Sequence, residues 1–305
     1  MRYLIYIFML VLPLVFISCG GNNPIKNGIP DKLIIGVYSG DNPVQTKAKN
    51  IAFQKYLEKE LGLPVEFIYT TDYTSLIEGI QRKKLHIAQL SPFAYVLATR
   101  KKCLVPLVTI GLDNQPSTYH SCIISSSKST IKTMEDLRKQ VHTLSLCFAD
   151  PASASGHLIP RAYLKSIGLE PDSNFKQVVF AGSHAAAVMS VVSGKIDIGC
   201  TTNDLMLNKL VEQGAIKKDD YNILWISDGI VNDVISASLD LSPDFRAKIA
   251  KAYLAVNKKD SIAFSGSIFR LYKDTRLMQF IPAQDSMYTT VRNIAETIKE
   301  LKLIQ

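Results

Sequence analysis

The chain has 305 residues, of which 47% are hydrophobic, and 35 Lys and Arg against 27 Asp and Glu give a formal net charge of +8. This length is enough for two domains of ordinary size, each with its own core. The basic residues are scattered over expected helices rather than gathered in a tract with aromatic residues. That distribution argues against a nucleic-acid partner.

The first residues indicate export. Arg2 precedes an uninterrupted apolar run that ends at Ile17, which is short for a membrane span and typical of a signal peptide. Phe16-Ile17-Ser18-Cys19 resembles the lipobox of bacterial lipoproteins, in which cleavage precedes a cysteine that then carries lipid. We therefore expect a signal peptide over 1–18, lipidation of Cys19, and a flexible tether over 19–30. An ordinary secretory signal with a chance cysteine is the alternative.

The next part of the chain alternates strands and helices. The pattern predicts strands over 33–38, 65–69 and 85–90, and helices near 48–57 and over 73–82. Such alternation with short connections predicts a parallel, doubly wound sheet. Ligands bind outside the carboxyl ends of such strands, where Ser39 and Ser91 lie.

A second unit of the same kind begins near Tyr119. The later part starts with an apolar run over 231–239, which we interpret as a return crossing into the first lobe, and continues in helices over 243–257 and 286–303. We therefore expect an α/β protein of two lobes, each with a doubly wound sheet, joined by two crossing strands that form a hinge. The expected boundaries are 31–118 plus 230–305 for lobe 1 and 119–229 for lobe 2.

The stretch Asp150–Arg161 lies where an apolar, strand-like run feeds a helix-like run. The first N–H groups of a helix have no internal acceptor, and that end of the helix is electropositive. Gly156 would let an anion approach the backbone, while Ser153, Ser155 and His157 add side-chain donors. The stretch is therefore a candidate seat for a small oxyanion. The alternative is that Ser155 only caps a helix.

At this point the chain resembles the phosphate, phosphite and phosphonate-binding proteins of ABC transporters, a branch of the type II periplasmic binding proteins. The resemblance covers most of the mature chain, and its most specific part is the Asp-Pro-x-Ser-x-Ser-Gly signature. Further matching stretches are 79–98, 119–137, 182–204 and 280–288. The resemblance implies two α/β lobes that close on a ligand like a hinged clamp.

The resemblance also implies roles for particular residues. These are oxyanion binding by Ser153, Ser155, Gly156 and His157, an aromatic contact by Tyr95, hydroxyl donation by Tyr119 and Ser121, and site closure by Asp204. A carboxylate beside an oxyanion selects a ligand that carries a proton or an ammonium group, since a fully ionised anion is repelled. Helix N-capping is the alternative role for this aspartate. Ala185 stands where many members have an acidic residue, which disfavours an amine-bearing phosphonate.

We therefore expect a lipid-anchored, monomeric solute-binding component of an ABC importer, exported to the cell envelope. It would capture a phosphonate, phosphite or phosphate and deliver it to a permease driven by a separate ATPase. The sequence contains no Gly-x-Ser-x-Gly, P-loop or His-Glu-x-x-His motif, so we expect neither catalysis nor a cofactor nor a metal. A ligand-sensing lipoprotein with the same clamp is the alternative. The pairing of Cys103, Cys122, Cys147 and Cys200 stays open.

Overall fold

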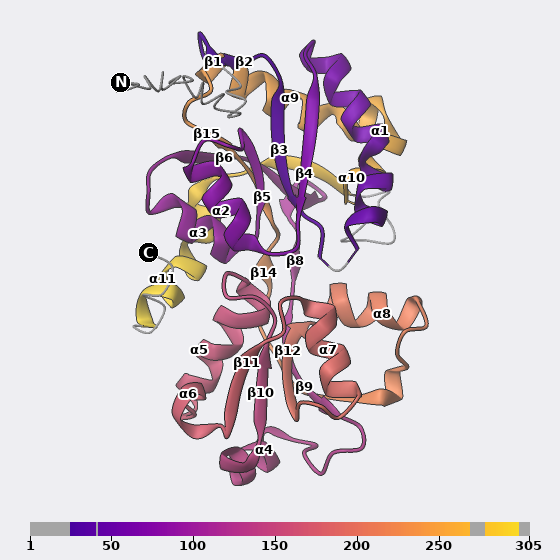
Figure 1. Ribbon diagram of the computed structural model, residues 1–305, viewed down its shortest axis with the longest axis vertical. Helices are drawn as coiled ribbons and strands as arrows, with labels where there is room; N and C mark the ends of the chain where they lie inside the picture. The colour runs from indigo at the N-terminus through magenta and orange to yellow at the C-terminus, as the bar shows by residue number, and fades with distance from the viewer. Residues whose placement is uncertain (1–24, 41, 269–277, 299–305) are drawn as a thin grey trace, which may run out of the picture.

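Two sheets of mixed strand direction form the centres of two lobes, which lie one above the other in Figure 1. The structure is a computed structural model that describes residues 25–40, 42–268 and 278–298. The expected signal peptide over 1–18 and the expected lipidation site Cys19 lie outside the described residues. None of the helices in the described part of the chain is long and apolar enough to span a bilayer.

The described chain begins with a hairpin of β1 (Ile25–Lys26) and β2 (Ile29–Pro30). The Asn27-Gly28 dipeptide forms its turn with φ of 52° and 76°, the left-handed conformation that a two-residue type I′ turn requires. The Gly28 carbonyl accepts a hydrogen bond of 2.9 Å from the Ser242 N–H of the first lobe. This segment is therefore fixed to the lobe, which corrects the expectation of a flexible tether over all of 19–30.

The sheet of the first lobe is made of β3 (Leu33–Tyr38), β4 (Val65–Thr70), β5 (Ile87–Leu90), β6 (Leu104–Leu112), β7 (Gln115–Pro116), β15 (Val234–Ser238) and β16 (Met278–Pro282). The order across the sheet is β16-β6-β15-β5-β3-β4, and β7 pairs with β6. β3 is parallel to β4 and β5, whereas β15 and β16 are antiparallel to their neighbours. The sheet is thus mixed rather than parallel, because the chain re-enters it through β15 in the opposite direction.

Helices cover both faces of this sheet, as the doubly wound prediction requires. The helices on one face are α1 (Pro43–Leu61), α9 (Pro243–Lys259) and α10 (Ser261–Ile268). Those on the other face are α2 (Tyr73–Gln81), α3 (Pro92–Thr99), the 3₁₀ turn η5 (Asp285–Tyr288) and α11 (Thr289–Thr297). The first face buries an aromatic cluster of Phe53, Tyr253 and Phe280, with ring centroids 5.1–6.5 Å apart.

The sheet of the second lobe has the order β11-β10-β12-β9-β13. Its strands are β9 (Ser121–Ser126), β10 (Ser145–Phe148), β11 (Gln177–Phe180), β12 (Ile198–Thr202) and β13 (Tyr221–Ile226). Its helical segments are α4 (Met134–Gln140), η1 (Val141–Thr143), η2 (Ala154–Leu158), α5 (Ile159–Ser166), α6 (Pro171–Asn174), α7 (His184–Val192), η3 (Asn203–Leu207), α8 (Asn208–Glu212) and η4 (Lys218–Asp220). Apolar clusters again lie on both faces, and Cys122, Cys147 and Cys200 are buried free thiols.

Two short strands carry the chain between the lobes. β8 (Thr118–Tyr119) leads out of the first sheet toward the second, and β14 (Ile230–Val231) leads back. The two strands pair antiparallel, with Ile230 opposite Tyr119, at the waist of the molecule in Figure 1. Any rotation of one lobe against the other must therefore pass through this pair of strands.

Candidate ligand-binding site

A cavity of about 240 Å³ lies between the two lobes. Five of the residues singled out in the sequence line it: Ser39, Ser91, Tyr119, Ser153 and Ser155. They follow the carboxyl ends of β3, β5 and β10 or lie on the crossing strand β8. The cavity thus occupies the place where α/β sheets bind their ligands, and helix N-termini surround it because helices begin where such strands end.

The turn after β10 is shaped by its own side chains. The Asp150 carboxylate accepts from the Ala152 N–H at 2.7 Å, and the Ser153 hydroxyl accepts from the Gly156 N–H at 3.0 Å. The helix then opens with the π turn η2, in which the Leu158 N–H donates to the Ser153 carbonyl at 3.1 Å. These bonds use the donors of the flanking residues. The Ala154 N–H donates to no other described residue. The same is true of the N–H and the hydroxyl of Ser155.

Ser121 contacts the turn without lining the cavity. In the π register of η2 the Ser155 carbonyl would accept from residue 160, but proline has no N–H. The Ser121 hydroxyl, from β9, donates to that carbonyl instead, at 2.6 Å. Ser121 therefore holds the backbone of Ser155 and lies one residue behind the cavity wall.

Gly156 also acts on the shape of the turn. A Cβ at this position would lie 2.5 Å from the Ala149 Cβ and 2.8 Å from the His184 Cε1, closer than van der Waals contact allows. Its N–H is occupied by Ser153, and Gly156 does not line the cavity. The glycine is therefore required for close packing of the turn against the sheet and α7, rather than for approach of an anion as expected.

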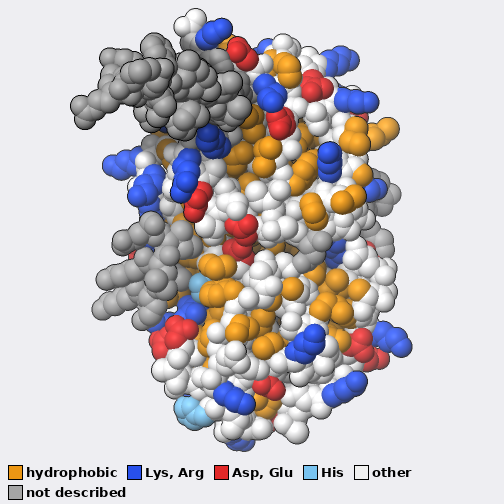
Figure 2. Space-filling model, viewed as in Figure 1, with side chains coloured by type: hydrophobic (Ala, Val, Ile, Leu, Met, Phe, Trp, Pro, Cys, Tyr) orange, Lys and Arg blue, Asp and Glu red, His pale blue; other side chains and the backbone are white. Residues whose placement is uncertain are grey.

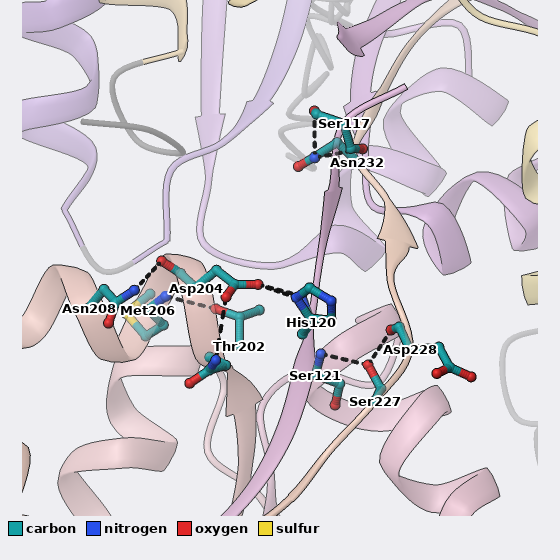
Figure 3. A network of polar contacts seen from close by, with 11 residues as sticks. Ser117, His120, Ser121, Thr202, Asp204, Met206, Asn208, Ser227, Asp228 and Asn232 are labelled. Atoms are coloured by element: carbon teal, nitrogen blue, oxygen red, sulfur yellow. Dashed lines mark hydrogen bonds and ion pairs between the residues drawn. The ribbon is translucent and has the colours of Figure 1, made fainter. Parts of the chain in front are cut away.

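A second π turn, η3, follows β12 on the same side of the cavity. The Thr202 hydroxyl caps it by accepting from the Met206 N–H at 2.7 Å, as Figure 3 shows. The turn points the apolar side chains of Leu205 and Met206 into the cavity, where Leu210 of α8 continues the same wall. Lys209, also from α8, adds a basic group.

The first lobe contributes aromatic rings and a carboxylate. The rings of Tyr38 and Tyr73 stack with centroids 4.2 Å apart, and both line the cavity. Asp233, between β14 and β15, is 9% exposed and also lines it, with one carboxylate oxygen accepting from the Gln89 side chain at 3.3 Å. The second lobe therefore lines the cavity with hydroxyls, helix N-termini, apolar side chains and the basic group of Lys209, and the first lobe adds aromatic rings and a carboxylate.

The lobes touch beside the cavity. The Ser91 hydroxyl of the first lobe donates to the Ala152 carbonyl of the second at 2.8 Å. The Tyr73 N–H at the start of α2 donates to the Asp150 carboxylate at 3.4 Å. Burial raises the pKa of Asp150 to about 6, with nearby Asp72 acting in the same direction. This contact thus places a titratable group between the lobes.

The remaining predicted residues lie away from the cavity. The Tyr95 hydroxyl donates to the Asp285 carboxylate at 2.8 Å and its ring packs on Tyr288, so it faces the turn η5. His157 is 3% exposed and points into the second lobe, where its nitrogens bond to Pro151 and Arg161. Neither residue lines the cavity, so the ligand contacts expected of Tyr95 and His157 stay predictions.

Asp204 is engaged at the crossing strand instead. Its carboxylate accepts from the His120 backbone N–H at 2.9 Å and bonds to the His120 ring at 2.6 Å (Figure 3). Figure 3 also shows Ser121 and Ser227 joined across the two crossing segments, through the Ser121 N–H and the Ser227 hydroxyl at 2.9 Å. Asp204 does not line the cavity and lies beside the crossing strand β8, so its expected role in closing the site stays a prediction.

Sequence reasoning missed several lining residues. Thr202 and Tyr73 lie where helical turns begin, and both line the cavity. The periodicity of the sequence does not show whether a helix begins with a π or an α turn, so it could not predict where these side chains point. Asp233 had a usable signal, because a charged residue within a buried apolar run requires a specific reason. His184 also lines the cavity, and its Nε2 lies 3.1 Å from the Ser153 hydroxyl.

Two further properties complete the description of the site. Within residues 25–40, 42–268 and 278–298, no group of three His, Cys, Asp or Glu side chains is placed to hold a metal ion. On the face shown in Figure 2, Lys and Arg side chains are scattered over both lobes.

Comparisons with known proteins agree with this architecture. The phosphate-import protein PhnD of Mycolicibacterium smegmatis is 25% identical over 296 residues, 92% of this chain and 91% of that protein. The phosphonates-binding periplasmic protein of Escherichia coli is 28% identical over 227 residues, 74% of this chain and 66% of that one. The structure of PhnD1 from Prochlorococcus marinus in complex with methylphosphonate superposes with a TM-score of 0.74 at 21% identity, covering 88% of this chain and 98% of that one.

The decisive match is to a family model. The model for the ABC transporter, phosphonate, periplasmic substrate-binding protein family matches residues 35–288, which include both sheets and both crossing strands. The family consists of substrate-binding transport proteins rather than enzymes, and its fold is the two-lobed periplasmic-binding-protein fold that the sequence predicted. The chain therefore belongs to the phosphonate family of periplasmic substrate-binding proteins of ABC transporters.

Proposed function

We propose that this protein captures a small phosphorus oxyanion, a phosphonate, phosphite or phosphate, in the cavity between its lobes and delivers it to an ABC permease. One observation carries the proposal. The Ser155 hydroxyl and N–H and the Ala154 N–H lie at a helix start beside the cavity, with no acceptor among the described residues. Such groups bind an oxyanion through hydrogen bonds, and Lys209 adds a positive charge at the cavity wall.

Asp233 is the acidic residue that we assign to ligand selection, in place of Asp204. Its carboxylate faces the cavity from the first lobe, where a fully ionised anion would be repelled. A singly protonated phosphorus oxyanion can donate a hydrogen bond to it, whereas sulfate has no proton to donate at neutral pH. A charge-assisted bond of this kind contributes about 1.5–3 kcal/mol, enough for tenfold discrimination or more.

The apolar wall favours a ligand with an organic substituent. The cavity of about 240 Å³ has room for more than a bare oxyanion, which displaces only a few water molecules. The remaining space is bordered by Leu205, Met206 and Leu210, and by Ala185. A short alkyl group on phosphorus would exclude water from this wall and gain about 0.8 kcal/mol per buried CH₂. We therefore expect alkylphosphonates to bind more tightly than phosphate.

Delivery would follow from closure of the lobes around the crossing strands. The ligand would be bound by Ser155 from the second lobe and by Asp233 from the first, so its presence favours the closed arrangement. Closure presents a continuous surface of both lobes, to which a permease can bind. The permease and its ATPase are the partners that this proposal implies.

A calorimetric titration tests ligand capture. The mature chain, stripped of ligand by unfolding and refolding, is titrated with phosphate, phosphite, methylphosphonate, propylphosphonate, 2-aminoethylphosphonate and sulfate. We expect micromolar or tighter binding of at least one phosphorus compound, a higher affinity for the alkylphosphonates than for phosphate, and no heat from sulfate. Silence of every phosphorus compound would refute the proposed ligand class.

The anchor and the transport step need tests in cells. We propose that Cys19 carries a lipid that holds the protein at the cell envelope, so Cys19→Ser should move it from the membrane fraction to the soluble fraction. Deleting the gene should abolish uptake of the phosphorus compound that binds best, and restoring it should recover uptake. Normal uptake in the deletion strain would contradict delivery to a permease and would favour a sensing role.

A further inference from the structure

The imidazole of His157 lies directly behind the turn that carries Ser153 and Ser155. It is 3% exposed and packs against the rings of Phe148 and Phe180, with centroids 4.8 Å away in each case. Both of its nitrogens have a partner inside the second lobe. The residue is therefore part of the support of the turn.

The partners of the ring determine which nitrogen carries the hydrogen. The Arg161 Nε–H donates to His157 Nε2 at 2.9 Å, and a guanidinium cannot accept a hydrogen bond. Nε2 must therefore be unprotonated, so Nδ1 carries the hydrogen and donates to the Pro151 carbonyl at 2.8 Å. A ring in this state has no N–H left for a ligand.

Arg161 is itself fixed in position. Only 4% of the residue is exposed, its guanidinium lies 4.9 Å from the centre of the Phe148 ring, and two of its nitrogens donate to the Asp172 carboxylate at 2.7 and 3.3 Å. A buried guanidinium held at both ends has little freedom to turn. It therefore holds the ring of His157 in a defined orientation.

We propose that Asp172, Arg161 and His157 form a positioning relay that fixes the Pro151 carbonyl and thereby the placement of Ser153 and Ser155, and that His157 makes no contact with the ligand. The bond from His157 to Pro151 closes a ring of the chain around these two serines. Loss of it would let the turn relax, because the first residues of a helix have few other bonds. The inference rests on the proposed function, since the serines matter only if they bind ligand.

The charged groups around His157 agree with this role. Arg161 and Asp172 are the ionisable residues whose charges act on the ring. Burial and the nearby guanidinium together lower the pKa of His157 to about 4, so the ring is neutral at neutral pH. A neutral ring with its hydrogen on Nδ1 suits a support and does not suit an anion ligand, for which a protonated ring would be favoured.

Two substitutions at one position separate support from contact. In His157→Asn the amide nitrogen replaces Nδ1 and can still donate to Pro151, while the bond from Arg161 is lost. In His157→Gln the longer amide replaces Nε2 and can still accept from Arg161, while the bond to Pro151 is lost. We expect methylphosphonate affinity to fall by about threefold for Asn, which keeps the bond to Pro151 but is no longer oriented by Arg161, and by about tenfold for Gln, the scale of one buried hydrogen bond. Contact through Nε2 predicts the reverse order.

A measurement on the wild-type protein keeps the proposal testable if either variant fails to fold. Correlation of the ring nitrogens with the ring protons by NMR reports which nitrogen is protonated. We expect the Nδ1–H form without ligand and no change of either nitrogen on addition of methylphosphonate. Protonation of Nε2, or a large shift of its signal with ligand, would overturn the proposal, as would equal affinities of all three proteins or a greater loss in Asn than in Gln.

Failure of the relay and failure of the proposed function give different results. If the wild-type protein binds no phosphorus compound, the function is wrong, and the tautomer without ligand still tests the hydrogen bonds. If the wild-type protein binds methylphosphonate and His157→Asn loses affinity while His157→Gln keeps it, the function stands and the relay is wrong.

Discussion

Ser155→Ala separates ligand binding from folding more cleanly than any other change in the turn. The substitution removes a hydroxyl that borders the cavity and donates to no other described residue, in a residue that is 1% exposed. No protein hydrogen bond is lost and no large cavity is created, so the free energy of unfolding should stay within about 0.5 kcal/mol of wild type. The effect should fall on the bound state alone.

The size of that effect follows from the charge of the ligand. A hydrogen bond to a charged group contributes about 1.5–3 kcal/mol, which corresponds to a rise of about 10-fold to 150-fold in Kd at 25 °C. Ser121→Ala is the matched control, because its hydroxyl donates to the Ser155 carbonyl at 2.6 Å and is fully buried. That carbonyl would lose its donor, so the control should lower the free energy of unfolding by about 1–3 kcal/mol.

Calorimetric titration with methylphosphonate and urea unfolding, both at pH 7.5, measure the two quantities. We expect Ser155→Ala to weaken binding without changing the free energy of unfolding. We expect Ser121→Ala to lower the free energy of unfolding. Wild-type affinity in Ser155→Ala would show that the oxyanion binds elsewhere. A loss of stability of 1 kcal/mol or more in Ser155→Ala would show that its hydroxyl has a partner in the protein.

Three further predictions follow from the site. Asp233→Asn should lower discrimination between methylphosphonate and sulfate by tenfold or more, whereas Asp204→Asn should leave it unchanged in the same titrations; the opposite result would return the selecting role to Asp204. Gly156→Ala should lower the free energy of unfolding by about 1–3 kcal/mol in urea, because its Cβ would overlap Ala149, and unchanged stability would contradict that packing. Asp150 is ionised in the native state only above a pKa of about 6, against 3.8 ordinarily, so the stability of wild type relative to Asp150→Asn should fall by up to about 3 kcal/mol as the pH rises from 4 to 7.5. The test is this pH dependence, because the amide keeps only one of the two acceptor oxygens, and a difference that does not depend on pH would refute the shift.

Strand ends could be located from the sequence because they depend on local patterns. Apolar runs followed within a few residues by serines placed Ser39, Ser91, Ser153 and Ser155 at the strand ends, and all four line the cavity. A strand end is defined by the change from buried to turn residues. An error of one residue in its predicted position therefore hardly changes which residues are expected near the cavity. The fold class followed from the same alternation of elements.

Side-chain direction after a strand end could not be predicted in the same way. An α-helix turns each successive side chain by about 100°, and the π turns η2 and η3 change that phase. An error of one residue therefore moves a side chain out of the cavity. The structure buries His157 in the second lobe and places Asp204 beside the crossing strand. Tyr95 lies four residues after Ser91, a full helical turn into α3, where its ring packs on Tyr288 of η5.

The most direct test of the central claim is a crystal structure of the mature chain with methylphosphonate. We predict that the phosphonate lies between the lobes, with one oxygen accepting from the Ser155 hydroxyl and N–H, a protonated oxygen donating to Asp233, and the methyl group toward Leu205 and Met206. A ligand bound outside this cavity, or one held by His157 with Ser155 unengaged, would contradict the account.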